Sequence, residues 1–415
     1  MYGRIALISV NGDPSAVIGA EEAGGQNVYV REVGKHLASL GYQIDMFTRR
    51  IDPSQAEVVE EAPNCRTIRL AAGPLEFVKR DNLHSYIPDF VDSLAAYARR
   101  HSYDAVHTHY WHSGMVGLAL REKLGIPVVH TYHSLGAIKY MNVAEIPASA
   151  QLRLSGERRI LEQADRIVAT SPQEAEHMRT YVSRKGSVDI IPCGVDARHF
   201  METDRAAARR VLGWTEQEKV VLYVGRFDKR KGIETLVRAV AQIEEPVRLV
   251  IGGGYTPDRG DGVEFERIRG IVEEVGLTSR TQFTGRIDQA DLPNFYTAAD
   301  VCVVPSHYEP FGLVAIEAMA CGTPVIASAV GGLCYSVVND ETGLLVPPRD
   351  AEGFAGAIRR VITDAGLRER FSAAGIRRIH DHFTWAGVSR QLGRLYANLA
   401  ARRTAQRPPK QQSVA

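Results

Sequence analysis

Two glutamates eight residues apart, Glu309 and Glu317, stand out in the segment SHYEPFGLVAIEAMACG, residues 306–322. Pro310 does not fit inside a helix, whereas the run from Gly312 has a helical composition, so we expect a helix to start close to Gly312. The free N–H groups of a helix start bind anions, and a carboxylate accepts hydrogen bonds from the paired hydroxyls of ribose or hexose. The segment therefore predicts a site for a sugar and an anion. The alternative is that both glutamates lie on the surface of an alanine-rich helix.

A basic loop, GRFDKRKG at 225–232, lies between a strand-like run and the helical run IETLVRAV. Arg226 and Lys231 are five residues apart across a tight turn, so we expect their charges to converge on one point. Two cations beside a helix start suit a diphosphate group. Lys229 and Arg230 belong to the same run, which leaves a solvated basic loop open as the alternative.

A double glycine precedes the helical pattern of GAEEAGGQNVYVRE, residues 19–32. Gly24 and Gly25 have no side chain, which allows a ligand to approach the backbone closely. The loop from Asn11 to Gly25 is too long for the GxGxxG fingerprint of dinucleotide-binding proteins, so the sequence argues against NAD.

Histidines gather where two neighbouring strands are expected to end. A metal site would need further ligands, but the sequence has no HExxH helix, and no Cys or Asp completes a ligand set. We interpret His109 and His133 as polar lining of a cleft. The histidines of this group are His107, His109, His112, His130 and His133.

Strand-like runs alternate with helical patterns along most of the chain, which predicts parallel sheets covered by helices on both faces. The series pauses near residues 191–200 and restarts. We therefore expect an α/β protein with two doubly wound domains and a ligand site in the cleft between them, beyond the carboxyl ends of the strands. The expected parts are residues 1–193, residues 194–385, a helix at 386–402 that returns to the first domain, and a disordered tail at 403–415. The expected strands are 4–10, 43–49, 104–110, 127–133 and 166–171, then 220–227, 247–254, 281–286, 301–306 and 323–328.

The composition argues against several classes of protein. Lys and Arg number 50 against 49 Asp and Glu, so no overall charge calls for nucleic acid or a membrane as a partner. No signal peptide and no apolar run long enough to span a bilayer is recognisable, so we expect a cytoplasmic protein. Five scattered cysteines fit a reduced protein better than a disulfide scaffold. They are Cys65, Cys193, Cys302, Cys321 and Cys334.

Taken together, these segments resemble the retaining glycosyltransferases of family 4, which have the GT-B fold of two Rossmann-like domains. EPFGLVAIE is similar to their E-x7-E segment, GRFDKRKGIETLVRA to their phosphate-binding loop, and AGGQNVYVRE to their N-terminal loop. The resemblance runs from about Arg4 to about Trp385. HSLGAIK, HYWHSG and GPLEFVKRDNL carry a finer resemblance to the sucrose-phosphate synthase subgroup, with the mycothiol-pathway glycosyltransferase next.

The resemblance implies UDP-glucose as the donor, no required cofactor and no metal. Arg226 and Lys231 would hold the leaving diphosphate, Glu317 the ribose and Glu309 the donor sugar, while His133 would lie near the transferred glucose. His133, Arg226, Lys231 and Glu309 are thus the implied catalytic residues. The implied donor-binding residues are Gly25, Arg226, Lys231, Arg286, Ile287, Glu309, Phe311, Gly312, Leu313 and Glu317.

The implied acceptor is fructose 6-phosphate, which would give sucrose 6-phosphate. The chain departs from the subgroup at Leu152, where a second arginine often precedes the residue equivalent to Arg153. The mycothiol enzyme usually has methionine where this chain has Gln26. The implied acceptor-binding residues are Gly24, Gln26, Lys79, Tyr110, Ser134, Lys139 and Arg153.

Several alternatives stay open at this point. Another acceptor would make the chain an inositol-phosphate glycosyltransferase, a mannosylfructose-phosphate synthase or a sucrose synthase, and the donor could carry ADP, GDP or mannose instead. A UDP-sugar 2-epimerase and a non-catalytic nucleotide-sugar-binding protein are the alternatives from other classes. The expected partners are small molecules only. The sequence does not define the oligomeric state, although a monomer is compatible with it.

Overall fold

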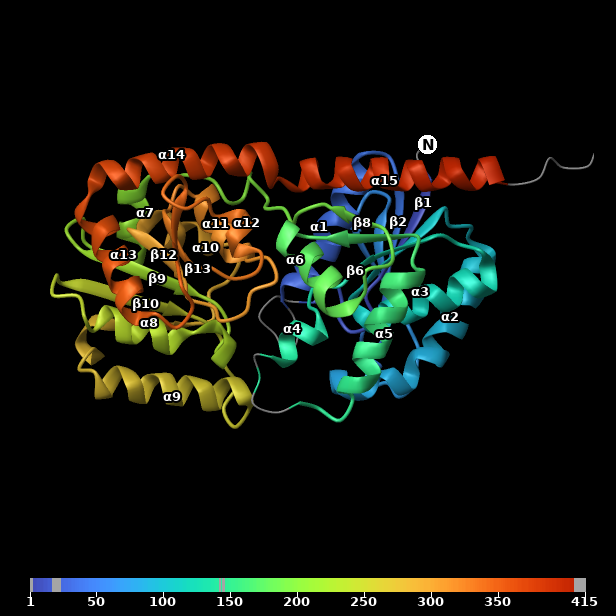
Figure 1. Ribbon diagram of the computed structural model, residues 1–415, viewed down its shortest axis with the longest axis horizontal. Coiled ribbons are helices and arrows are strands. Elements are labelled where there is room, and N and C mark those ends of the chain that lie inside the picture. Colours follow the sequence, from blue (N-terminus) through green and yellow to red (C-terminus); the bar gives the residue numbers. More distant parts are fainter. Residues whose placement is uncertain (1–2, 17–23, 142, 144–145, 407–415) are drawn as a thin grey trace, which may run out of the picture.

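The computed structural model describes residues 3–16, 24–141, 143 and 146–406. Two α/β domains lie side by side, the first coloured blue to green and the second yellow-green to orange (Figure 1). This is the predicted fold class: each domain is a mainly parallel sheet with helices packed against it. In the part of the chain that is described, no helix is both long and apolar enough to cross a membrane.

The first domain contains an eight-stranded sheet in the order β3-β4-β2-β1-β5-β6-β7-β8. All neighbouring strands are parallel except β3 and β4, which pair antiparallel. The strands are β1 (Arg4–Ile8), β2 (Gln43–Arg49), β3 (Val58–Ala62), β4 (Cys65–Leu70), β5 (Ala105–His109), β6 (Val128–Thr131), β7 (Arg166–Ala169) and β8 (Val188–Ile190). The helices are α1 (Gly25–Ser39), α2 (Ile87–Arg100), α3 (Tyr110–Leu124), α4 (Gly136–Tyr140), α5 (Ala150–Gln163) and α6 (Pro172–His177).

The β3–β4 hairpin corrects the expectation of a wholly parallel sheet. The sequence of β3, VVEEA, carries charged residues on a strand that is exposed or half-buried along its whole length. An edge strand that faces water on both sides needs no continuous apolar run, so its sequence lacks the signal that marks buried strands. Two short strands, β8 and β14, were missed as well.

The second domain contains a six-stranded parallel sheet in the order β11-β10-β9-β12-β13-β14. Its strands are β9 (Lys219–Val224), β10 (Val247–Gly252), β11 (Thr281–Gly285), β12 (Val301–Val304), β13 (Val325–Ser328) and β14 (Gly343–Val346). Its helices are α7 (Arg205–Leu212), α8 (Ile233–Val240), α9 (Gly260–Glu274), α10 (Leu292–Ala298), α11 (Leu313–Ala320), α12 (Leu333–Ser336), α13 (Ala351–Thr363) and α14 (Ala365–His382).

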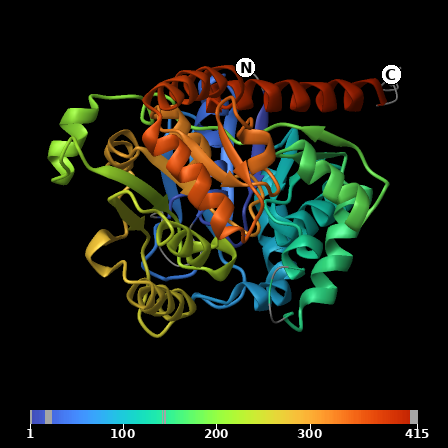
Figure 2. The ribbon, with the colours of Figure 1, turned by 60° about the vertical axis from the view of Figure 1, so that its left-hand side comes forward.

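The last helix, α15 (Trp385–Gln406), runs back over the first domain (Figures 1 and 2). It packs against α1 and β5, and Val30 of α1 shares a hydrophobic cluster with Trp385 and Leu392. The helix continues four residues into the segment expected to be disordered, and the rest of that segment, 407–415, lies outside the described residues.

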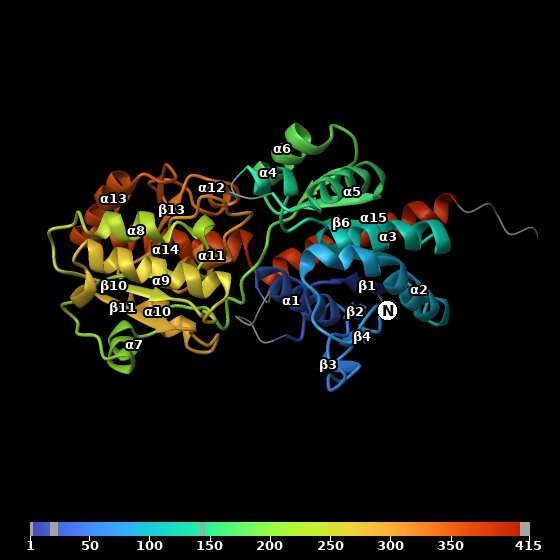
Figure 3. The same cartoon turned by 90° about the horizontal axis from the view of Figure 1, so that it is seen from below.

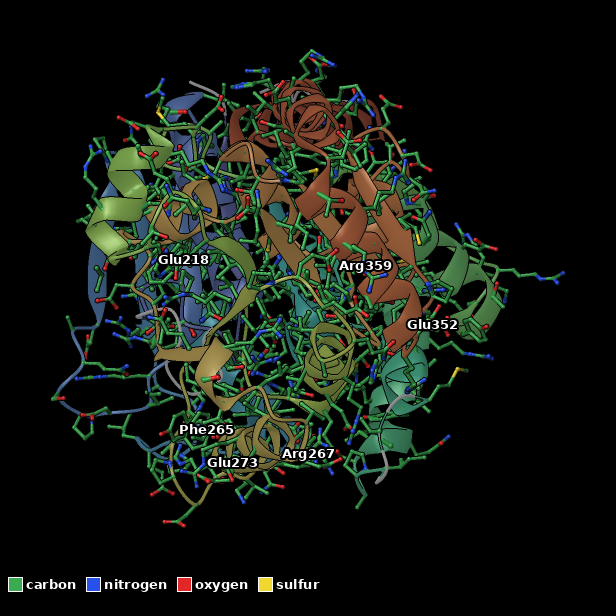
Figure 4. The ribbon with its side chains drawn as sticks, turned by 90° about the vertical axis from the view of Figure 1, so that its left-hand side faces the viewer. Glu218, Phe265, Arg267, Glu273, Glu352 and Arg359 are labelled. Carbon is green, nitrogen blue, oxygen red and sulfur yellow. The ribbon has the colours of Figure 1, made fainter. Side chains whose placement is uncertain are left out.

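The strand order reverses once in each sheet, beside β1 in the first and beside β9 in the second. Helices on either side of such a point leave a crevice beyond the carboxyl ends of the strands. The domain boundary is also bridged by contact between α6 and α12, which lie near each other when the molecule is seen from below (Figure 3). Charged side chains such as Arg267 and Glu273 instead cover the end of the second domain that is turned away from the first (Figure 4).

Candidate active site

The E-x7-E segment begins just after β12, at the reversal point of the second sheet. Gly312 caps α11 with a left-handed backbone, φ 93°, and a Cβ at this position would lie 2.5 Å from a carbon of Leu333. Both the left-handed backbone and the close approach of Leu333 therefore require a glycine at position 312. The helix starts at Leu313, as predicted, with Glu309 in the preceding loop and Glu317 in its second turn.

Glu309 is held by the basic loop that follows β9. Nζ of Lys231 lies 2.5 Å from Oε2 of Glu309, and Oγ of Ser306 approaches the same oxygen at 3.5 Å. The two loops fit together because Gly232 has φ 67°, and a Cβ there would lie 2.0 Å from the carbonyl oxygen of Pro305. The structure therefore joins a sequence-predicted cation directly to a sequence-predicted carboxylate.

Arg226 lies two residues after the end of β9 and is exposed. Within the described ranges, no group forms a hydrogen bond or an ion pair with its guanidinium. The neighbouring Arg230 differs, because its Nε donates to Oδ1 of Asp228 at 3.0 Å. Burial raises the pKa of Asp228, but hydrogen bonds and the charge of Arg230 outweigh it and hold the pKa at about 2. Arg226 thus remains available for a ligand, as does the exposed Lys229.

Glu317 faces a cavity of about 290 Å³ between the two domains. Its Oε2 accepts a hydrogen bond from the hydroxyl of Tyr296 at 2.9 Å. Burial raises the pKa of Glu317 to about 7, although Tyr296 and His199 act in the opposite direction. The cavity is also lined by Val28 and Arg31 of α1, so both domains form its walls.

Three other predicted donor residues, Arg286, Ile287 and Phe311, lie in loops that follow β11 and β12 and do not line this cavity. Arg286 is exposed and pairs with Asp288 at 3.1 Å, while a Cβ on Gly252 would lie 2.4 Å from Cδ1 of Ile287, so Ile287 covers the end of β10. Phe311 is buried, with its ring 5.8 Å from that of Phe383.

The double glycine of the first domain lies opposite the start of α11. A Cβ on Gly25 would lie 3.2 Å from Cδ1 of Leu313, so these two predicted donor residues meet across the domain boundary. Gly24 caps α1 with an extended backbone, and Nε2 of Gln26 donates to Oγ of Ser9 at 3.0 Å.

Two predicted acceptor residues, Ser134 and Arg153, contact each other. A terminal nitrogen of Arg153 donates to the Ser134 carbonyl at 2.6 Å, and its Nε donates to Glu157 at 2.7 Å. The guanidinium of Arg153 lies 4.9 Å from the ring centre of Tyr110, and that of Arg80 lies 5.4 Å from the same ring. The guanidiniums of Arg80 and Arg153 therefore both lie close to the ring of Tyr110.

The positive charges of nearby arginines act on Lys139. Burial lowers its pKa to about 8, helped by the charges of Arg153, Arg230 and Arg80 in that order. Since Arg230 belongs to the second domain, cations from both domains act on Lys139. Lys79 is exposed, and its side chain forms no hydrogen bond or ion pair with the described residues. We refer to Arg80, Lys139, Arg153 and Arg230 as the basic cluster.

Sequence reasoning missed two members of the basic cluster, Arg80 and Arg230. Both stand beside a basic residue that was singled out, Lys79 in one case and Lys231 in the other. The runs KR and KRK were a signal, but the spacing did not show which side chain of each run acts on Tyr110 or Lys139.

The histidines are mostly bound within the first domain. His107 contacts Tyr396 of α15 at 2.7 Å and Thr131 at 2.8 Å, and Nδ1 of His130 lies 2.8 Å from Oγ1 of Thr108. The interpretation of His109 as cleft lining is wrong, because its side chain is fully buried behind His133. Among the described residues, no group of three or more His, Cys, Asp or Glu side chains is arranged to hold a metal ion.

Comparison with known proteins identifies the class to which this fold and site belong. Residues 24–194 match the family model of the glycosyl transferase 4-like domain, and residues 204–378 match that of glycosyl transferases group 1. A sucrose-phosphate synthase structure from Thermosynechococcus elongatus is 50% identical, with a TM-score of 0.91, over 96% of this chain and 100% of that one.

A D-inositol 3-phosphate glycosyltransferase from Kribbella flavida is 38% identical over 90% of each chain. HepE from Anabaena, solved with UDP-glucose, is 19% identical with a TM-score of 0.76 over 95% of this chain and 100% of that one, a likeness of fold. The chain therefore belongs to the family-4 glycosyltransferases of the GT-B fold and is an enzyme of that class.

Proposed function

We propose that this enzyme transfers glucose from UDP-glucose to fructose 6-phosphate and releases sucrose 6-phosphate and UDP. The observation that carries the proposal is the 50% identity to a sucrose-phosphate synthase over nearly the whole of both chains. The identity to the D-inositol 3-phosphate glycosyltransferase is lower, 38%, and covers less of the chain.

The donor would lie along the crevice of the second domain. Arg226, which is exposed and has no partner among the described residues, suits the diphosphate, together with the N–H groups at the start of α11. Lys231 would move from Glu309 to the diphosphate, which would free that carboxylate for the hydroxyls of glucose. Glu317 would take the ribose in the interdomain cavity.

In the proposed reaction, the bond between C1 of glucose and the oxygen of the β-phosphate breaks. A bond forms between C1 and the anomeric oxygen of fructose 6-phosphate on the same face, which retains the configuration. The proton of that hydroxyl passes to the leaving phosphate. Negative charge grows on the diphosphate as the first bond breaks, and fixed cations with a helix start stabilise it without rearranging.

The basic cluster would bind the phosphate of the acceptor. Arg153 is oriented by Glu157 and by the Ser134 carbonyl, so its guanidinium is fixed before the substrate arrives. Lys139 has its pKa lowered by burial and by neighbouring arginines, which means that an anion at this place would relieve their mutual repulsion.

Transfer to D-inositol 3-phosphate is the second candidate. The observation that favours it is the name shared by the curated relatives, which are 35–38% identical to this chain. Both acceptors carry a phosphate, so the basic cluster supports either one equally.

A matrix of donors and acceptors tests the proposal. UDP-, ADP- and GDP-glucose and UDP-N-acetylglucosamine would each be combined with fructose 6-phosphate, free fructose and inositol 3-phosphate. Nucleotide release and product mass would be measured. We expect UDP-glucose with fructose 6-phosphate to be the best pair. A preference of tenfold or more for inositol 3-phosphate or free fructose would contradict the acceptor, and no transfer from UDP-glucose would contradict the donor.

A further inference from the structure

His133 is held by a second histidine that sits behind it. Nδ1 of His109 lies 3.0 Å from Nε2 of His133, and the ring of His109 is fully buried. His133 is only half-buried. Its other ring nitrogen, Nδ1, forms no hydrogen bond with the described residues and is not enclosed by them. Nδ1 is therefore the ring nitrogen of His133 that remains accessible to a ligand.

The backbone around this pair is unusual. His133 has φ 58°, and Tyr110, directly after His109, has φ 71°, although neither residue is a glycine. Such conformations cost energy and persist where the surroundings enforce them, often at functional sites. Tyr29 packs against both rings, at 5.6 Å from His109 and 4.9 Å from His133, and Trp385 supports Tyr29 from behind at 5.5 Å. The two imidazoles are thus fixed in orientation.

Both imidazoles are neutral in the folded protein. Burial lowers the pKa of His133 to about 3 and that of His109 well below its ordinary value. One proton then lies between the two rings, and it can belong to either nitrogen. The ring that supplies this proton has no hydrogen on its other nitrogen, and the ring that accepts it carries its own proton on its other nitrogen.

The surroundings of Nε2 of His109 show which of the two nitrogens carries the shared proton. Its Nε2 is enclosed and has no hydrogen-bond partner within the described part of the chain. If His133 were the donor, Nε2 of His109 would be a buried N–H without an acceptor, an arrangement rarer in proteins than an acceptor that lacks a donor. If His109 is the donor, its Nε2 carries no hydrogen and His133 carries its own proton on Nδ1.

We propose that His109 is a positioning residue that donates its Nδ1 proton to Nε2 of His133 and so fixes His133 as the tautomer whose Nδ1–H donates a hydrogen bond to a hydroxyl of the transferred hexose. The second half of this statement rests on the proposed function and on the family resemblance, which implies that the transferred glucose lies near His133. The first half concerns the ligand-free enzyme alone.

Nitrogen NMR tests the tautomer without any substrate. Histidines labelled with ¹⁵N would be examined in long-range proton–nitrogen spectra of the full chain, and His133 would be assigned with His133→Asn. We expect a protonated Nδ1 and an unprotonated Nε2 on His133. A protonated Nε2 would overturn the proposal.

Donor analogues test the role in substrate binding. We would compare kcat/KM for UDP-glucose with the values for UDP-sugars that lack one glucose hydroxyl each. A lost neutral hydrogen bond should lower kcat/KM about three- to tenfold for one analogue in the wild-type enzyme. This penalty should become smaller in His109→Leu, in which the tautomer of His133 is no longer fixed, and should persist in His109→Asn, whose amide can donate from the position of Nδ1.

Thermal unfolding would confirm that both variants are folded. An analogue penalty that is the same in His109→Leu and in the wild-type enzyme would overturn the positioning role even if the tautomer is as expected. If the wild-type enzyme transferred no hexose from any UDP-sugar, the proposed function would be contradicted, and the nitrogen spectra would still decide the tautomer.

Discussion

Replacing Arg226 by alanine removes the cation that we place at the leaving diphosphate. Arg226 is exposed and its side chain forms no hydrogen bond or ion pair with the described residues, so its removal leaves no hydrogen-bonding group of the ligand-free protein without a partner. Substitutions of this kind usually change the free energy of unfolding by less than about 0.5 kcal/mol. Any large loss of activity in Arg226→Ala should therefore come from the reaction itself.

The magnitude follows from the growth of charge during the reaction. A unit charge about 4 Å from the diphosphate interacts with it by about 4 kcal/mol at an effective dielectric constant near 20. Removal of one fixed electrostatic stabiliser of a transition state costs about 2.7–4 kcal/mol, which lowers the rate about a hundred- to a thousandfold. Because the charge grows as the bond breaks, kcat should fall more than KM for the donor rises.

The assay is steady-state UDP release with each substrate varied in turn. Lys229→Ala is the matched control, since Lys229 is an exposed lysine of the same loop, and we expect nearly wild-type kinetics for it. Lys231→Ala is a less clean test, because it leaves the half-buried Glu309 without its partner at 2.5 Å and should also lower the melting temperature. Nearly wild-type kcat in Arg226→Ala, or equal losses in Arg226→Ala and Lys229→Ala, would refute the diphosphate assignment.

Four further predictions concern pH, the acceptor and metals. Because the pKa of Glu317 is raised to about 7 and the carboxylate is the form that accepts two hydrogen bonds, KM for the donor should fall as the pH rises through about 7, and Glu317→Gln should flatten this profile. Lys139 is cationic below its lowered pKa of about 8, so KM for the sugar phosphate should rise as the pH passes about 8 in the wild-type enzyme but not in Lys139→Arg. Lys139→Ala should raise the same KM roughly ten- to a hundredfold with little change for the donor, as measured by initial rates. Activity should survive EDTA, because in the proposed site Arg226 and Lys231 would supply the positive charge at the diphosphate; complete loss that magnesium restores would contradict this.

The fold could be predicted because its signal is local. Buried parallel strands such as β1 and β9 are short apolar runs, and each is followed by a helical pattern, so the two doubly wound domains follow from the order of segments. The start of α11 was predictable for the same reason, since Pro310 and Gly312 leave few other positions for it. The hairpin of β3 and β4 was not predictable, because an exposed edge strand has no apolar run to mark it.

The sequence by itself determined the fold class and indicated candidate residues for binding a nucleotide sugar, because residue types and places at strand ends do not depend on distant parts of the chain. Only the tertiary structure decided how those residues pair. It placed Lys231 against Glu309, which are 78 positions apart, and it buried His109 behind His133. It also brought the charge of Arg230 from the second domain to Lys139 of the first. Such pairings depend on how two sheets and their loops come together, and a carboxylate or an imidazole has the same local sequence signal whether it faces a ligand or another side chain.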